Sequence, residues 1–315
     1  MDRVVPREPA ALLAEAHDGA VAALARLISY VEGEQYREET AALVYRTPAP
    51  YVIGVTGSPG VGKSTLTDRL IDAALASANQ RVAVLCVDPS STSSGGALLG
   101  DRVRMQRHAG TTNLYIRSLA TRGAHGGLSL CVPDAIRVLG AVGFDLVIIE
   151  TVGVGQIEID IEKFADTVLV LVSPGWGDAL QVAKAGILEI ADIFVVNKSD
   201  RDGATSAHHD LDELVQATAR TQWVPPVLDT TATTGEGVAA LWEAIGRHRE
   251  ERSPAARNAT KMWRAATQLR GAIERQRDRE AQTAQASAAY GFALAALVAD
   301  EIDPYQAARE VLSSL

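Results

Sequence analysis

Runs of apolar residues recur through the middle of the chain and are separated by stretches of helical composition. The runs are nearly continuous rather than alternating with polar residues, which is typical of strands buried on both faces. Such strands, alternating with helices, predict an α/β fold: a mainly parallel sheet covered by helices, with helical extensions at both ends. The predicted strands span residues 51–56, 82–87, 145–149, 167–172, 192–196 and 227–231.

The residue pattern of the N-terminal segment predicts helices. Apolar residues at three- and four-residue steps form one stripe, which indicates an amphipathic helix. A second short helix is expected over about 35–46, and it ends at the prolines of 47–50 because proline lacks the N–H and restrains its predecessor. The stripe consists of Leu13, Ala16, Ala20, Leu24, Leu27 and Val31.

The C-terminal segment is also predicted to be helical. Residues 255–283 indicate a long helix and residues 284–300 an apolar helical patch. Asp303 is expected to cap a last helix with Pro304 at its first position. The apolar face of that helix is predicted to hold Tyr305, Ala308, Val311, Leu312 and Leu315. These patterns divide the chain into an N-terminal helical extension (1–48), a central α/β domain (49–252) and a C-terminal helical region (253–315) that packs on its own core or dimerises.

Composition and charge narrow the possible partners. The formal net charge is −9, which argues against nucleic acid as the main partner because that affinity comes largely from basic phosphate contacts. No apolar stretch approaches the length of a membrane span, and the N-terminus has no apolar core of a secretory signal. Two cysteines are too few for a disulfide framework. The sequence therefore predicts a cytoplasmic protein without a membrane segment.

A phosphate-binding loop follows the first predicted strand. Residues 57–65 match the pattern G-x-x-x-x-G-K-[ST] and precede a predicted helix, which is the context that supports the motif. The glycines let backbone N–H groups surround the phosphates, and the helix N-terminus favours negative charge. Lys63 is expected to reach the β- and γ-phosphates. The predicted phosphate-binding residues are Gly57, Ser58, Pro59, Gly60, Val61, Gly62, Lys63, Ser64 and Thr65.

A second motif indicates a binding site for the base of the nucleotide. Asn197, Lys198 and Asp200 directly follow the strand 192–196 in an N-K-x-D pattern. A carboxylate at Asp200 can accept from both N1–H and the 2-amino group of guanine, whereas adenine leaves it unpaired, so the site is expected to prefer GTP and GDP over adenine nucleotides. Thr231 and Ala232, after the last strand, are positioned like the short loop that lines the base, although an ordinary strand-end turn is an alternative.

Acidic residues at strand ends suggest a magnesium site. Asp88 and Glu150 end the strands 82–87 and 145–149, and Asp101 lies in a glycine-containing loop. Together with the Ser64 hydroxyl they form a set of oxygen ligands, which Mg²⁺ prefers. Lys63 and Mg²⁺ are expected to stabilise charge during hydrolysis, while Glu150 and Gln156 are candidates for orienting the water.

These motifs together resemble the MeaB/ArgK family of GTPases, whose human member is the methylmalonic aciduria type A protein. The resemblance rests on DPSS (88–91), GGALLGDRVRM (95–105), ETVGVGQ (150–156) and PGWGDALQVAKAGILEIADIFVVNKSD (174–200). It implies a GTP-hydrolysing chaperone, typically a homodimer, that serves an adenosylcobalamin-dependent acyl-CoA mutase by gating cofactor loading and protecting the mutase. It also implies three switch segments, about 88–104, 150–158 and 174–184. Ile157, Trp176 and Ala185, which lie in or directly after these segments, depart from the family pattern.

Two alternative functions belong to other classes. A metallochaperone GTPase would need a cluster of cysteines and histidines, and His208–His209 is the only adjacent histidine pair. A P-loop kinase would prefer ATP, which the N-K-x-D motif disfavours. The sequence leaves open whether a methylmalonyl-, isobutyryl- or ethylmalonyl-CoA mutase is the partner.

Overall fold

A computed structural model of the chain divides it into two compact units, Met1–Arg257 and Asn258–Leu315. None of its described helices is long and apolar enough to cross a membrane. The structure describes residues 7–33, 36–77, 80–88, 108, 111, 113–120, 131–151, 161–175, 187–218 and 223–314.

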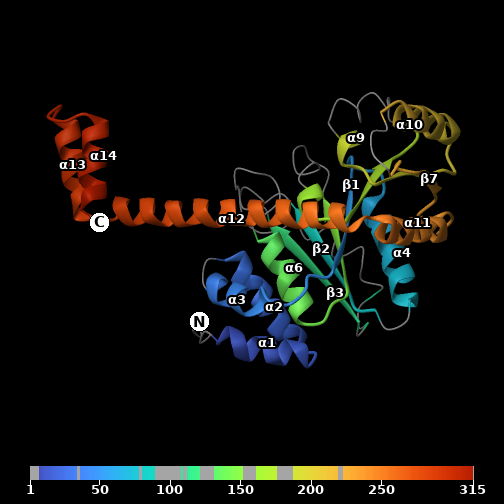
Figure 1. Ribbon diagram of the computed structural model, residues 1–315, viewed down its shortest axis with the longest axis horizontal. Helices are drawn as coiled ribbons and strands as arrows, with labels where there is room; N and C mark the ends of the chain where they lie inside the picture. The colour runs from blue at the N-terminus through green and yellow to red at the C-terminus, as the bar shows by residue number, and fades with distance from the viewer. Residues whose placement is uncertain are drawn as a thin grey trace. The chain divides into compact units, whose positions relative to one another are not determined.

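Within the described residues, a seven-stranded sheet forms the centre of the first unit (Figure 1). Its neighbouring strands all pair in parallel, in the order β3-β2-β4-β1-β5-β6-β7. The carboxyl ends of the strands therefore share one edge, where loops can bring distant residues together. The strands are β1 (Tyr51–Gly57), β2 (Val82–Asp88), β3 (Leu114–Ala120), β4 (Leu146–Thr151), β5 (Thr167–Val172), β6 (Ile193–Asn197) and β7 (Val227–Thr230).

The α/β fold predicted from the sequence is confirmed, and each predicted apolar run forms a strand. The sequence prediction missed β3 because Arg117 and Ser118 interrupt its apolar residues. This strand lies at the edge of the sheet, and Arg117 donates from Nη2 to the Glu32 carboxylate at 2.5 Å. The contact with Glu32 of α2 gives the Arg117 guanidinium a charged partner in this half-buried position.

Helices cover both faces of this sheet. On one face, α4 and α11 pack through residues such as Leu66, Leu70 and Leu241 against β1 residues Ile53 and Val55. The other face carries α1, α2, α6 and α10. The helical elements of this unit are α1 (Pro9–His17), α2 (Val21–Glu32), α3 (Arg37–Val44), α4 (Lys63–Ala76), α6 (Val132–Ala141), the 3₁₀ helix η2 (Ile161–Lys163), α9 (Ile187–Ile190), α10 (Ala204–Thr218) and α11 (Val238–Glu251).

The single N-terminal helix predicted from the apolar stripe is wrong. A turn at 18–20 separates α1 from α2, and Gly19 adopts a left-handed φ of 98°. Ala20, which the stripe placed on the buried face, is exposed, whereas Leu24, Leu27 and Val31 are buried. The 3.6-residue period of the stripe continues across the turn by coincidence, so periodicity alone did not reveal the break.

Gly54 allows a close approach between the central strand and the segment that follows β4. A Cβ at this position would lie 2.7 Å from Ile161 Cγ1 and 2.9 Å from the Ala165 Cβ. Ile161 begins η2, and its side chain is fully buried. The missing side chain on β1 therefore makes the room in which η2 packs on the sheet.

A buried polar cluster lies at the opposite edge of the sheet, where the strands begin. His248 of α11 is hydrogen-bonded through Nδ1 to Thr167 at 2.7 Å, and its Nε2 lies 3.2 Å from an Asp192 carboxylate oxygen. The Tyr51 hydroxyl also bonds Thr167, and burial raises the pKa of Tyr51 to about 12. These groups connect α11 to the sheet and lie away from the edge where the strands end.

The second unit consists of α12 (Pro254–Gln285), whose first residues belong to the first unit, α13 (Ala288–Val298) and α14 (Pro304–Ser313). The predicted cap is present, because Asp303 accepts hydrogen bonds from the backbone N–H groups of Tyr305 and Gln306. The same two bonds, that of Gln306 first, hold the pKa of Asp303 below its usual range.

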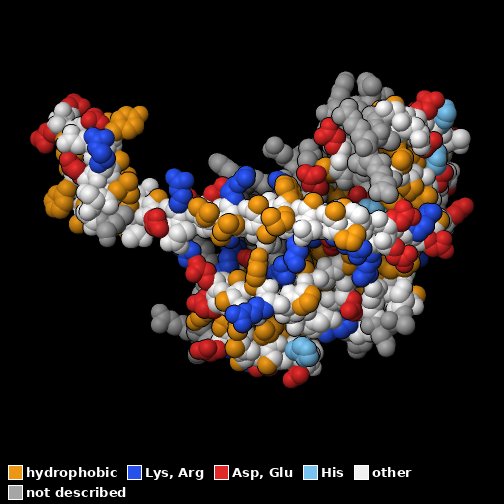
Figure 2. All heavy atoms as spheres, in the orientation of Figure 1, with side chains coloured by type: hydrophobic (Ala, Val, Ile, Leu, Met, Phe, Trp, Pro, Cys, Tyr) orange, Lys and Arg blue, Asp and Glu red, His pale blue; other side chains and the backbone are white. Residues whose placement is uncertain are grey.

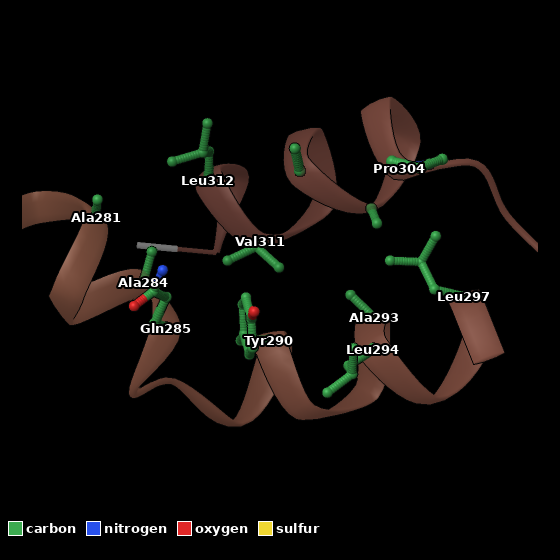
Figure 3. Close-up of a pocket in the computed structure, with 12 residues that line it drawn as sticks. Ala281, Ala284, Gln285, Tyr290, Ala293, Leu294, Leu297, Pro304, Val311 and Leu312 are labelled. Carbon is green, nitrogen blue, oxygen red and sulfur yellow. The ribbon is translucent and has the colours of Figure 1, made fainter.

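The core of this unit is small and consists of Ala284, Ala293, Ala307 and Val311. A pocket of about 270 Å³ lies beside that core, between the end of α12 and the two shorter helices, and Leu297 and Val311 contribute to its lining (Figure 3). Of the predicted apolar face of α14, Ala308, Val311 and Leu312 line this pocket, whereas Tyr305 is 78% exposed. Hydrophobic and basic side chains are both exposed along α12 (Figure 2).

Replacing Gly54 by alanine should lower the free energy of unfolding by about 1–3 kcal/mol, because the added methyl group overpacks the contact with Ile161 and Ala165. The matched control is Gly246→Ala in α11, where a Cβ meets open space and alanine favours the helix. Urea unfolding of both variants measures the difference. Equal stabilities would contradict the packing role of Gly54.

Candidate nucleotide-binding site

The predicted phosphate loop connects the end of β1 to the start of α4 at the carboxyl edge of the sheet. Gly57 has a φ of 137°, and a Cβ there would lie 2.3 Å from the Leu171 carbonyl oxygen on β5. Gly62 has a φ of 100° immediately before the helix. Both positions need glycine, since other residues rarely adopt such angles. Ser58 and Val61 are buried, whereas Pro59, Gly60 and Thr65 are exposed.

Lys63 is 6% exposed, and its side chain folds back onto the loop. Its Nζ donates to the carbonyl oxygens of Gly57 at 2.5 Å and Ser58 at 2.9 Å. A buried ammonium group is costly unless it is hydrogen-bonded, so these carbonyls stabilise it. The geometry therefore holds a positive charge against the inside of the loop, at the N-terminus of a helix that also favours anions.

Ser64 and Glu150 meet at the start of α4. The Ser64 Oγ donates to Glu150 Oε1 at 2.5 Å, and Glu150 is 2% exposed. Glu150 reaches this point because β4 lies directly beside β1, where Val55 is its register partner. The two side chains present hydroxyl and carboxylate oxygens, which is the ligand chemistry that Mg²⁺ prefers. The residues present thus fit a magnesium ion.

The side chain of Asn197 bridges the phosphate loop and the end of β7. Its Nδ2 donates to the Val61 carbonyl at 2.8 Å. Its Oδ1 accepts from the Ala232 N–H at 3.1 Å and from the Thr230 hydroxyl at 3.2 Å. Lys198, in a left-handed conformation with φ of 60°, donates from Nζ to the Gly60 carbonyl at 2.6 Å. Asn197 and Lys198, two of the residues predicted to bind the base, therefore also support the phosphate loop.

Asp200 differs from its two neighbours in the motif. Its carboxylate is exposed, and within the described part of the chain it makes no hydrogen bond or ion pair. Ser199 lies between Lys198 and Asp200 in the sequence, and its hydroxyl is 3.0 Å from that of Thr231. Thr231 and Ala232 are buried at the same edge of the sheet. The structure thus brings the 197–200 segment and the 231–232 segment together beside the phosphate loop.

Arg69 was not singled out in the sequence, although it contacts this region. From α4 its Nε donates to the Ala232 carbonyl at 2.9 Å and its Nη2 to the Thr233 carbonyl at 2.6 Å. No sequence motif marks this contact, since it depends on how α4 lies against the turn after β7. The only available signal was an arginine among the polar positions of an otherwise amphipathic helix.

Several predicted residues lie outside the described part of the structure. Asp101, Gln156 and most of the three predicted switch segments, with Ile157, Trp176 and Ala185, belong to this group. For Asp88 the backbone is described as the end of β2, beside β4, but its side chain is not.

The two adjacent histidines on α10 contact different carboxylates. His208 Nδ1 lies 3.0 Å from Asp229, and the 71%-exposed His209 lies 3.2 Å from Glu213 one turn away. Within the described ranges, no group of three or more histidine, cysteine, aspartate or glutamate residues is arranged to hold a metal ion. This geometry offers no positive support for the metallochaperone alternative.

A glycine-rich loop between the first strand of a parallel sheet and a helix that begins with lysine and serine defines a P-loop nucleotide-binding protein. Comparison with known families then identifies the group. The chain belongs to the family described as methylmalonyl-CoA mutase-associated GTPase MeaB, which matches residues 24–289. The resemblance drawn from the motifs is confirmed, and the family's fold implies that a guanine nucleotide is the ligand.

Individual relatives support the same assignment. A candidate GTPase of Pyrococcus horikoshii is 48% identical over 237 residues, which cover 72% of this chain and 74% of that protein. The fused isobutyryl-CoA mutase of Paraburkholderia xenovorans is 39% identical over 244 residues, covering 71% of this chain and 19% of that protein. A crystal structure of an LAO/AO transport system kinase matches with a TM-score of 0.65 at 23% identity, over 99% of this chain and 97% of that chain, which supports the fold alone.

The bridge made by Asn197 predicts unequal effects of alanine at two loop glycines with similar backbone angles. A Cβ at Gly62 would lie 2.3 Å from Asn197 Nδ2, whereas a Cβ at Gly60 meets open space. Gly62→Ala should therefore destabilise the nucleotide-free chain by about 2 kcal/mol more than Gly60→Ala, because the displaced amide loses hydrogen bonds worth about 1 kcal/mol each. Urea unfolding measures both, and equal losses would show that the bridge contributes nothing.

Proposed function

We propose that this chain binds and hydrolyses GTP and acts as a chaperone of an adenosylcobalamin-dependent acyl-CoA mutase, gating cofactor loading and protecting the mutase. The observation that carries the enzymatic part is the buried arrangement of Lys63, Ser64 and Glu150 at the start of α4. Membership of the mutase-associated GTPase family supports the chaperone part.

The phosphate end of the nucleotide is proposed to bind along residues 57–65. Lys63 would exchange its bonds to the Gly57 and Ser58 carbonyls for bonds to the β- and γ-phosphate oxygens. This exchange keeps the ammonium group hydrogen-bonded and gives it an anionic partner. Hydrogen bonds to a charged phosphate oxygen are stronger than those to a neutral carbonyl oxygen. Lys63 is therefore proposed to stabilise negative charge as the bond between the β- and γ-phosphates breaks.

The metal ligands are proposed to be Ser64, Asp88, Asp101 and Glu150, with direct support from the oxygen pair of Ser64 and Glu150. When bound, Mg²⁺ neutralises charge on the phosphates. Glu150, held by the Ser64 hydroxyl, and Gln156 are the candidates for orienting the attacking water.

The base is proposed to bind beside Asn197, Lys198, Asp200, Thr231 and Ala232. Asp200 has the exposure and the acceptor chemistry that guanine requires, because its two oxygens can accept from N1–H and the 2-amino group. An adenine base offers no such pair of donors, so it would leave a desolvated carboxylate unpaired.

The partner is proposed on the basis of relatives. In the Paraburkholderia xenovorans protein, a segment 39% identical to this chain lies within a fused isobutyryl-CoA mutase. A covalent fusion of this kind supports contact between a chain of this family and a mutase. The turnover assay with each mutase identifies which acyl-CoA mutase is the partner.

The first test is turnover of GTP and ATP by the purified chain, alone and with methylmalonyl-, isobutyryl- or ethylmalonyl-CoA mutase. We expect turnover of GTP only, accelerated by one mutase, since catalytic groups of such switches assemble on docking. Lys63→Ala should lower turnover about a hundredfold or more, a typical loss when one charge-stabilising group is removed. The exposed Lys261→Ala is the control.

Each outcome of this assay is decisive for one part of the proposal. Preference for ATP would overturn the assignment of the base site. GTP turnover that no mutase changes would remove the partner but keep the GTPase. Full activity of a folded Lys63→Ala variant would remove the proposed role of the loop.

Asp200→Asn should raise the Kd for GDP about a hundredfold, because two hydrogen bonds to a charged acceptor are lost. The same change should favour xanthosine diphosphate, whose C2 carbonyl can accept from the new amide. Asp202→Asn removes another exposed carboxylate two residues away and should leave both affinities unchanged. Calorimetric titration gives the Kd values, and unchanged GDP binding by Asp200→Asn would exclude this residue from base recognition.

A homodimer through the C-terminal helical region, 253–315, is also proposed. Large hydrophobic side chains of α12 are exposed in the second unit, among them Leu269 at 63% and Ile273 at 52%. Leu269→Glu should shift the chain toward monomer in sedimentation equilibrium, because the charge would be buried in the interface. Val21→Glu, at a residue of α2 that is 65% exposed, is the matched control. A monomeric unmodified chain would contradict the dimer.

A further inference from the structure

Arg69 connects the helix after the phosphate loop to the turn after β7. Its guanidinium donates to two consecutive carbonyl oxygens, those of Ala232 and Thr233, at 2.9 and 2.6 Å. The side chain is 30% exposed, and its remaining ion-pair partner, Asp72 on the same helix, is 4.0 Å away. The main contacts of this side chain are therefore with the turn and not with its own helix.

The turn is also held by its own backbone, by Asn197 and by the Ser199 hydroxyl, which lies 3.0 Å from that of Thr231. Thr231 N–H donates to the Glu236 carbonyl, and the N–H groups of Thr234 and Gly235 donate to the Thr231 carbonyl. The Ala232 N–H donates to Asn197. Arg69 thus binds the carbonyl of the same residue whose N–H is bound by Asn197, so the peptide groups on both sides of Ala232 are held from different elements.

An arginine suits this position for physical reasons. Its planar guanidinium group presents several N–H donors in a fixed fork, which fixes the orientation of both acceptors. Hydrogen bonds from a charged donor are also roughly twice as strong as neutral ones. Lysine would offer a single point charge on a flexible stem and would hold the two carbonyls less well.

We propose that Arg69 is a positioning residue for guanine recognition: it holds the 231–235 turn in the shape that accepts the base. The inference rests on the proposed function, because it assumes that Ala232 lies beside the base. It predicts a division of effects along the nucleotide. Loss of Arg69 disorders the base end, whereas the contacts of Lys63 and Ser64 with phosphate do not pass through the turn. Preorganisation of a loop contributes to affinity by removing an ordering cost at binding.

The test compares Arg69→Gln and Arg69→Lys with the unmodified chain, using GDP, ADP and inorganic tripolyphosphate as ligands. Arg69→Gln should raise the Kd for GDP about tenfold, speed GDP dissociation and reduce the preference for GDP over ADP. The Kd for tripolyphosphate, which has no base, should not change. Arg69→Lys should be intermediate, and the KM for GTP should change more than kcat.

Arg247→Gln, which removes an exposed arginine of α11, is the control and should leave all the Kd values unchanged. An equal loss of GDP and tripolyphosphate affinity in Arg69→Gln would mean general damage to the fold and would overturn the inference. Unchanged GDP binding would overturn it as well, while guanine recognition itself would stand. If the unmodified chain failed to prefer GDP over ADP, the proposed base site and this inference would both fall.

Discussion

The buried amide of Asn197 is the contact on which the arrangement of the nucleotide edge depends. It joins the phosphate loop at Val61 to Thr230 and Ala232 after β7, segments that lie far apart in the sequence. Both the amide nitrogen and the amide oxygen of Asn197 have hydrogen-bond partners. Moving either segment would leave a buried group unpaired, at a cost of about 1–3 kcal/mol for each. The loop for the phosphates and the turn proposed for the base therefore form one frame, whose geometry follows from the parallel order of β1, β5, β6 and β7.

A second constraint is electrostatic. Lys63 and Glu150 are both almost fully buried at the start of the same helix, and each is hydrogen-bonded to groups of the loop or of α4. Burying charges is favourable only with such partners. The strand order β2-β4-β1 brings the acid beside the loop, because a crossover inserts β4 between two strands that precede it in sequence. The resulting site presents a cation and an oxygen donor pair to the same small volume, which suits a phosphate and a magnesium ion.

The two units differ in how completely they bury their own hydrophobic side chains. The first buries large side chains on both faces of its sheet, such as Leu139 and Phe194 on one face and Leu66 on the other. The second has a core of three alanines and a valine and exposes large hydrophobic residues on all its helices. A core of that size stabilises a helical unit weakly. The proposed nucleotide site lies in the first unit, and the proposed dimer would cover exposed hydrophobic side chains of the second.

The sequence by itself determined the α/β class, the phosphate loop, the acid at the end of β4 and the N-K-x-D motif. These features depend on local order: apolar runs, glycines before a helix, and residues that directly follow a strand. Tertiary structure decided the rest. The polar edge strand β3, the break at Gly19, the bridging role of Asn197 and the contact of Arg69 with the turn could not be read from spacing. The physical reason is that hydrogen-bond partners and tolerated polarity depend on which strands are neighbours and which helix lies beside which turn, and that order is set by packing between distant segments.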